Sequence, residues 1–226
     1  MKKKADTKPI RKVTDGAIRN KERTMQKMIH AVGEVLKEKG YSGLTAKNII
    51  NKAEVDRKLI ADYFGNLNNL IEAYIASNDY WMAKVAPKLQ TIVSGSERFA
   101  SDEIISILHL MFDEVNTSAD LRSILIWEIS EYQEKLRQLA DNREALGTEL
   151  FKITDKDFSG TDIDQRAILA LQIAGIYYLI LHAKACGSTF CEIDISTLEG
   201  KNAIKKALEK LVTLMYNSAK DQQSTN

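Results

Sequence analysis

The sequence predicts an all-α fold, and three observations support this. The 226 residues contain only 2 Pro and 11 Gly, too few for the frequent turns of a β-sandwich or barrel. Long stretches of helix-forming residues separate these breakers, and their apolar positions recur at helical spacing. Apolar residues make up 44% of the chain, enough for a well-buried core.

The first predicted helix starts at Lys21 and runs for about 18 residues. Its apolar residues recur along one face: Met25, Met28, Ile29, Val32, Val35 and Leu36. Gly40 can end this helix because glycine readily adopts the left-handed conformation found after helix C-termini.

Two short helices follow. Thr45 is a good N-cap for a helix over about 46–52, with Ile49, Ile50 and Ala53 facing inward. After a tight turn at 53–55, Asp56 can cap a second helix that buries Leu59 or Ile60, Tyr63 and Phe64. Two short helices joined by such a turn are typical of a helix-turn-helix.

Further helices complete the predicted bundle. Asn66 or a close neighbour caps a helix that carries Leu70, Ile71, Tyr74 and Ile75 towards Trp81. Later helices are expected near 101–116, 119–140, 142–153, 164–186 and 197–219, with a polar loop over 155–164.

Charge is segregated along the chain. Its 32 Lys and Arg nearly balance 31 Asp and Glu, for a net charge of +1. Residues 1–65, however, carry 16 basic and 8 acidic residues, a net of +8, whereas the rest carries 16 and 23, a net of −7. A basic segment on an acidic protein is typical of a nucleic-acid-binding module, although a solvated lysine-rich tail is the alternative.

Residues 39–56 and 63–71 resemble the N-terminal domain of TetR-family transcriptional regulators. The shared elements are Lys39-Gly40-Tyr41 at the end of the first helix, Thr45 at the start of the second, Ala53-Glu54-Val55 in the turn, Tyr63-Phe64, and a leucine-rich fourth helix. The resemblance covers about residues 22–76. It implies an all-α protein: an N-terminal three-helix DNA-binding domain with a helix-turn-helix, then a C-terminal helical bundle for ligand binding and dimerisation.

The sequence departs from the family pattern at several positions. Glu54 stands where a glycine is usual, Ala61 where an aromatic residue is frequent, and Gly65 and Leu67 where a lysine is common. The departures imply weaker phosphate contacts from this region. The basic arm, residues 1–20, is a hypothetical substitute that could follow phosphates or enter a minor groove.

The resemblance and the helical spacing together predict the DNA-contacting residues. The face opposite the buried one carries Arg57, Lys58, Ala61 and Asp62. Arg57 can contact a guanine or only a phosphate, and Asp62 can accept from a cytosine amino group or orient Arg57 or Lys58. Like their family counterparts, Thr45, Lys47 and Tyr63 can contact phosphates; for Tyr63 the alternative is a core aromatic residue.

A small-molecule effector pocket is expected between helices of the C-terminal bundle. Its candidate residues are His109, Phe112, Trp127, Tyr132, Tyr177 and Tyr178, and the alternative for each is a plain core or dimer-interface position. No metal-binding histidine pattern, phosphate-binding loop or hydrolase nucleophile motif is present. We therefore expect neither a cofactor nor an enzymatic activity.

A homodimer is expected from the helix that starts near Asp164. This helix is apolar on nearly all sides, so that every face must be covered, and a partner subunit is the natural cover. With the last helix it forms a predicted four-helix interface, which the resemblance also implies. The interface candidates are Ile168, Leu171, Ile176, Leu179, Leu208, Leu211 and Met215.

No secretory signal follows Met1, and the apolar run of about 15 residues at 167–181 is shorter than the roughly 20 that span a bilayer. We expect a cytoplasmic location, no membrane contact, and Cys186 and Cys191 as reduced thiols that are either inert or oxidant-sensitive.

The predicted organisation is a basic arm (1–20), a DNA-binding domain (21–66), an effector and dimerisation domain (67–220) and a polar tail (221–226). The predicted function is a repressor that binds a roughly palindromic double-stranded DNA operator as a homodimer and is released by a small molecule. The alternatives are a helical-bundle protein whose basic arm binds an acidic partner or RNA, and a helical enzyme.

Overall fold

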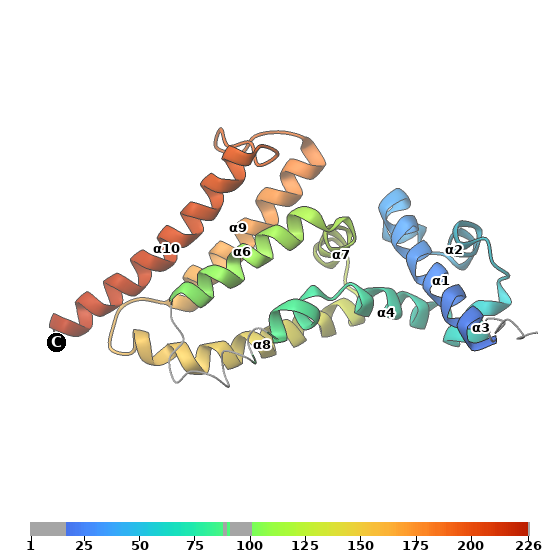
Figure 1. Ribbon diagram of the computed structural model, residues 1–226, viewed down its shortest axis with the longest axis horizontal. Helices are drawn as coiled ribbons and strands as arrows, with labels where there is room; N and C mark the ends of the chain where they lie inside the picture. The colour runs from blue at the N-terminus through green and yellow to red at the C-terminus, as the bar shows by residue number, and fades with distance from the viewer. Residues whose placement is uncertain (1–16, 88–89, 91–100, 226) are drawn as a thin grey trace, which may run out of the picture. The chain divides into compact units, whose positions relative to one another are not determined.

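The computed structural model describes residues 17–87, 90 and 101–225. This part of the chain contains nine α-helices, a 3-10 turn, a π-helical turn and no β-strand, with one isolated bridge between Phe190 and Ile193. The all-α prediction is therefore confirmed. The chain forms two compact units, divided between Tyr74 and Ile75 (Figure 1).

The N-terminal unit contains α1 (Ala17–Lys39), the 3-10 turn Tyr41–Gly43, α2 (Ala46–Ala53), α3 (Lys58–Phe64) and most of α4 (Leu67–Ser77). α1 starts four residues before the predicted Lys21, so that Ala17–Asn20 are helical and only residues 1–16 of the predicted arm lie outside the described residues. The unit buries a small apolar core: Met28, Val32, Val35, Ile49, Leu70 and Tyr74.

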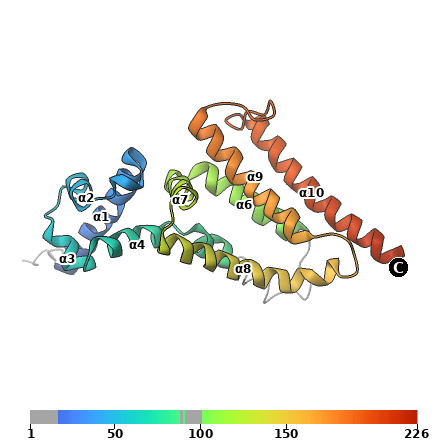
Figure 2. The same ribbon diagram turned by 180° about the vertical axis from the view of Figure 1, so that it is seen from behind.

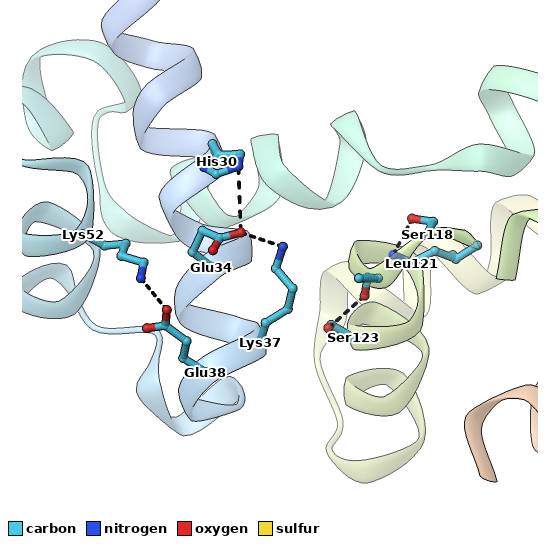
Figure 3. A network of polar contacts seen from close by, with 9 residues as sticks. His30, Glu34, Lys37, Glu38, Lys52, Ser118, Leu121 and Ser123 are labelled. Atoms are coloured by element: carbon cyan, nitrogen blue, oxygen red, sulfur yellow. Dashed lines mark hydrogen bonds and ion pairs between the residues drawn. The ribbon is translucent and has the colours of Figure 1, made fainter. Parts of the chain in front are cut away.

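Ion pairs lie on the surface of this unit, within α1 and between α1 and α2 (Figure 3). Lys52 of α2 forms an ion pair with Glu38 of α1. One turn earlier on α1, Lys37 Nζ lies 2.6 Å from Glu34 Oε1 and lowers the pKa of that carboxyl group, mainly by donating a hydrogen bond. These exposed pairs stabilise the fold only modestly, and the buried apolar residues account for most of the packing.

The C-terminal unit contains the π-helical turn η2 (Trp81–Val85), α6 (Ser101–Thr117), α7 (Ala119–Ser130), α8 (Glu134–Phe158), α9 (Gln165–Cys186) and α10 (Leu198–Thr225). α6 packs against α9 and α10 (Figures 1 and 2). The Gln172 amide of α9, itself buried, donates to the Leu208 carbonyl of α10 at 3.1 Å.

Several predicted boundaries in this unit were wrong. The predicted helix 119–140 is two helices, because the chain is extended at Glu131 and Gln133 between α7 and α8. α8 continues through residues 155–158, the first four of the predicted 155–164 loop, since Phe158 is buried and extends its apolar face. α10 continues to Thr225, so that the predicted tail 221–226 is helical up to that residue.

Side chains cap several helices, and Asn66 does so as predicted. Ser118 Oγ accepts from the Leu121 N–H at 3.1 Å and caps α7 (Figure 3). Asp164 caps α9 by accepting from the Ala167 N–H at 3.0 Å, and Asn66 accepts from the Asn69 N–H at 2.9 Å at the start of α4. A side-chain oxygen that accepts from the N–H three residues on is the common way to satisfy the first turn of a helix.

Candidate nucleic-acid interface and ligand cavity

The start of α2 is set by a local hydrogen-bond network. Thr45 Oγ1 accepts from the Asn48 N–H at 3.2 Å, as expected of the predicted N-cap. The Asn48 amide donates to the Gly43 carbonyl at 2.8 Å, and Lys39 Nζ donates to the amide oxygen of Asn48 at 3.2 Å. Thr45 and Lys47 are both exposed at this helix end, where N–H groups and the helix dipole favour a phosphate.

The turn between α2 and α3 contains a residue in an unfavourable conformation. Glu54 has φ 51° and ψ 50°, the left-handed region in which glycine is preferred. Its N–H donates to the Asn51 carbonyl at 3.4 Å, and its side chain pairs with Lys27 at 3.3 Å. The glycine that the family usually places here would relieve this strain, so the chain retains the turn geometry without the favoured residue.

α3 exposes the residues that the sequence predicts. Asp56 Oδ1 accepts from the Lys58 N–H at 2.9 Å, and Ile60 is buried beneath the helix. Arg57, Lys58, Ala61 and Asp62 are exposed on its outer side. Within the described residues, the side chains of Arg57, Lys58 and Asp62 form no hydrogen bond or ion pair with one another or with any neighbour. The role of Asp62 at DNA stays a prediction.

Tyr63 is neither fully buried nor fully exposed. Its ring is half-buried against the unit, and Lys21 Nζ of α1 lies 5.2 Å from the ring centroid. This cation–π contact places a positive charge next to the tyrosine. α1 thus adds a basic side chain, Lys21, beside the exposed face of α3. The residue spacing within the helix-turn-helix did not indicate this contact.

The C-terminal unit contains a cavity of about 560 Å³ bounded by η2, α6, α7, α8 and α9. This volume lies within the range of small-molecule sites. Most of its wall is aliphatic or aromatic, including Trp81, Val85, Ile107, Met111, Leu150, Phe151, Leu169 and Ile173. Tyr177 also lines it, and its hydroxyl lies 3.3 Å from that of Tyr80.

Of the six predicted pocket residues, only Tyr177 lines this cavity. Phe112 and Trp127 are buried elsewhere in the core, and Tyr132 is 69% exposed. His109 Nε2 lies 3.2 Å from the Lys205 carbonyl, while Tyr178 packs against His182 and Phe190 on the surface. The wall instead comes mainly from aliphatic residues of α6, α8 and α9, which no sequence motif distinguishes from ordinary core.

The predicted dimer-interface residues divide into two groups. Ile176, Leu208 and Met215 are buried in the core of their own chain, so their assignment to an interface was wrong: they face α6 and the rest of the bundle. Leu171 is 75% exposed and Leu211 47% exposed, while Ile168 and Leu179 are half-buried. Leu214, another apolar residue of α10, is 50% exposed.

α9 is therefore covered only in part by its own chain. By length and composition it could cross a membrane, and 22% of its most apolar 18-residue window is buried. The buried Gln172 and the contact with α6 are features of a core helix. Cys186 at its end and Cys191 in the following turn are free and exposed.

No protein-family model matches the sequence, and no curated protein matches it. Solved structures do match. The fatty acid degradation regulator FadR from Bacillus halodurans has 15% identity and a TM-score of 0.58 over 84% of this chain and 94% of that one. A TetR transcription regulator from Haloarcula marismortui has 15% identity and a TM-score of 0.56 over 86% and 98%.

A third match is NalD, the secondary repressor of the MexAB-OprM multidrug efflux pump in Pseudomonas aeruginosa. It has 18% identity and a TM-score of 0.54 over 88% of this chain and 96% of NalD. These likenesses span both units of the chain. The fold is that of TetR-family transcriptional regulators, as the resemblance in residues 22–76 predicted.

Proposed function

We propose that this protein is a ligand-responsive, non-enzymatic transcriptional repressor that binds a roughly palindromic DNA operator as a homodimer. The observation that carries the proposal is the outer face of α3. It is the second helix of a helix-turn-helix, and its Arg57, Lys58 and Asp62 side chains are exposed without partners in the described part of the chain. Unpaired donors and acceptors on such a helix can contact base edges and phosphates in a major groove.

The exposed apolar residues of α9 and α10 support the homodimer. Leu171, Tyr178, Leu211 and Leu214 are each between 47% and 75% exposed. A cluster of large apolar side chains on two neighbouring helices is typical of a protein interface. A second copy that covers it would present two α3 helices to half-sites about 34 Å apart.

The cavity supports a small-molecule effector. Its wall includes α9, whose outer residues are the proposed dimer interface, and η2, which follows α4 in the chain. A molecule that binds one arrangement of these helices better than another shifts the population between them. A difference of a few kcal/mol in effector affinity is enough to change operator occupancy.

The test is selection of bound sequences from a random duplex pool by the purified full-length protein at two salt concentrations. The informative variant is Arg57→Ala, Lys58→Ala. The matched control is Lys206→Ala, Lys220→Ala, which removes the same charge from exposed positions of α10. A palindromic site that the control retains and the α3 variant loses supports the proposal.

Sequence-blind, salt-sensitive binding that is indifferent to the α3 variant would contradict it. That result would favour the alternative in which the basic segment, whose first 16 residues lie outside the described part of the chain, binds an acidic partner or RNA.

A further inference from the structure

The cavity wall contains charged residues as well as apolar ones, and both of its arginines form ion pairs. Arg143 of α8 forms two contacts with the Glu128 carboxylate of α7, from Nη1 to Oε1 at 3.3 Å and from Nη2 to Oε2 at 3.0 Å. The two side chains are only 10% and 23% exposed. A buried guanidinium and carboxylate joined in this way neutralise each other.

The other cavity-lining charges are nearer to solvent. Arg166 pairs with Asp155 at 2.6 Å, and both side chains are about half exposed. Its guanidinium also lies 4.9 Å from the Phe151 ring centroid. Glu144 is exposed and remains hydrated. The cavity thus offers no buried, uncompensated charge of either sign to a ligand.

We infer that the cavity binds an uncharged, mainly apolar molecule with one hydrogen-bond-accepting group of the carbonyl type; this inference rests on the effector site of the proposed function. An anionic or cationic head group would lose its hydration and meet an Arg143–Glu128 pair whose charges already neutralise each other. Transfer of an unpaired charge into such a site is strongly unfavourable, whereas an apolar body gains from burial against the aliphatic wall.

The accepting group is inferred from donors buried in the same wall. Trp81 Nε1 and Arg143 Nε are both buried, and neither has a hydrogen-bond partner within the described residues. Both belong to residues that line the cavity. Leaving such a donor without a partner is unfavourable, so a carbonyl oxygen that reaches either one after a small side-chain adjustment would be bound preferentially.

The test compares three ten-carbon probes whose head groups are neutral, anionic and cationic: 2-decanone, decanoate and decylammonium. Each is titrated into the full-length protein by calorimetry at pH 7, below its micelle concentration and without DNA. The expected result is that 2-decanone binds with a Kd at least about tenfold lower than either charged probe. Equal or tighter binding of decanoate or decylammonium, or no binding of 2-decanone, would overturn the inference.

A single substitution tests the cause of the preference. Glu128→Gln leaves Arg143 without its counter-charge, and decanoate affinity should rise at least about fivefold relative to 2-decanone. The matched control is Glu149→Gln on α8, which removes a carboxylate from an exposed pair with Lys152 and should leave the ratio unchanged. If Glu128→Gln leaves the ratio unchanged too, the charge pair does not determine ligand choice.

A cavity-filling variant confirms where the probe binds. Ile173→Trp places a larger ring in the wall and should abolish 2-decanone binding while far-UV circular dichroism stays unchanged; retained binding would place the probe elsewhere and overturn the assignment. If this variant does not fold, the ratio of decanoate affinity to 2-decanone affinity in Glu128→Gln still tests the inference. Because no titration includes DNA, failure of the operator selection and failure of the ligand preference are separate results.

Discussion

The hydroxyl groups of Tyr80 and Tyr177 lie 3.3 Å apart and join the segment that follows α4 to α9. Tyr80 is 6% exposed, whereas Tyr177 lines the cavity. Tyr80 precedes Trp81 at the start of the π-helical turn, and the two rings are 5.4 Å apart. This buried hydroxyl pair therefore positions part of the cavity wall.

Burial raises the pKa of Tyr80 well above its ordinary value, and the neighbouring Tyr177 adds to the shift. Above about pH 10 the unfolded chain releases this proton while the folded chain retains it, so stability should fall as pH rises through that range. Tyr80→Phe should lose less stability than the wild type between pH 8 and pH 11 in urea unfolding. The control is Tyr178→Phe, at an exposed position. If the unfolding free energy of Tyr80→Phe falls with pH as steeply as that of the wild type, the prediction is contradicted.

Gly200 lies where no side chain fits. A Cβ at this position would lie 1.9 Å from the Asp194 carbonyl oxygen in the turn before α10. Gly200→Ala must therefore displace backbone, and we expect a loss of roughly 2–4 kcal/mol in the free energy of unfolding. Gly147→Ala is the control, because its Cβ would meet only Phe151 at 3.9 Å and should be neutral or stabilising by up to about 1 kcal/mol. Equal stability of the two variants would show that the turn adapts.

The strain at Glu54 can be measured with two substitutions. Both Glu54→Gly and Glu54→Ala remove the exposed ion pair with Lys27. Only glycine adopts the left-handed conformation without a steric penalty, so Glu54→Gly should be more stable than Glu54→Ala by about 1 kcal/mol in thermal or chemical unfolding. Glu54→Ala as stable as Glu54→Gly would mean that the turn changes its conformation.

A charge on the outer face of α10 tests the proposed dimer. Leu211→Glu should convert the protein to a monomer, because a carboxylate would be buried without a partner in the interface. Ile129→Glu is the control, since Ile129 is 78% exposed on α7. Sedimentation velocity distinguishes the outcomes. If Leu211→Glu remains a dimer, the proposed interface is contradicted. If Ile129→Glu dissociates the dimer, the interface includes α7 instead.

Local features of the sequence predicted the parts of the fold that depend on neighbours within a few residues. Thr45 and Asn66 cap their helices by accepting an N–H three residues on, a contact that needs no other element. The exposed face of α3 followed from helical spacing in the same way. Both features reappear in the structure as predicted.

The tertiary structure alone decided which apolar residues face which neighbour. Phe112 and Tyr177 were both predicted pocket residues, yet one is fully buried and the other lines the cavity. Likewise, Ile176 lies in the core of its own chain, whereas Leu171, one and a half turns earlier on α9, is exposed. Hydrophobicity favours burial of such residues, but packing contacts such as those of α6 with α9 and α10 determine which of them are buried. Burial is non-directional, so only packing selects its partners.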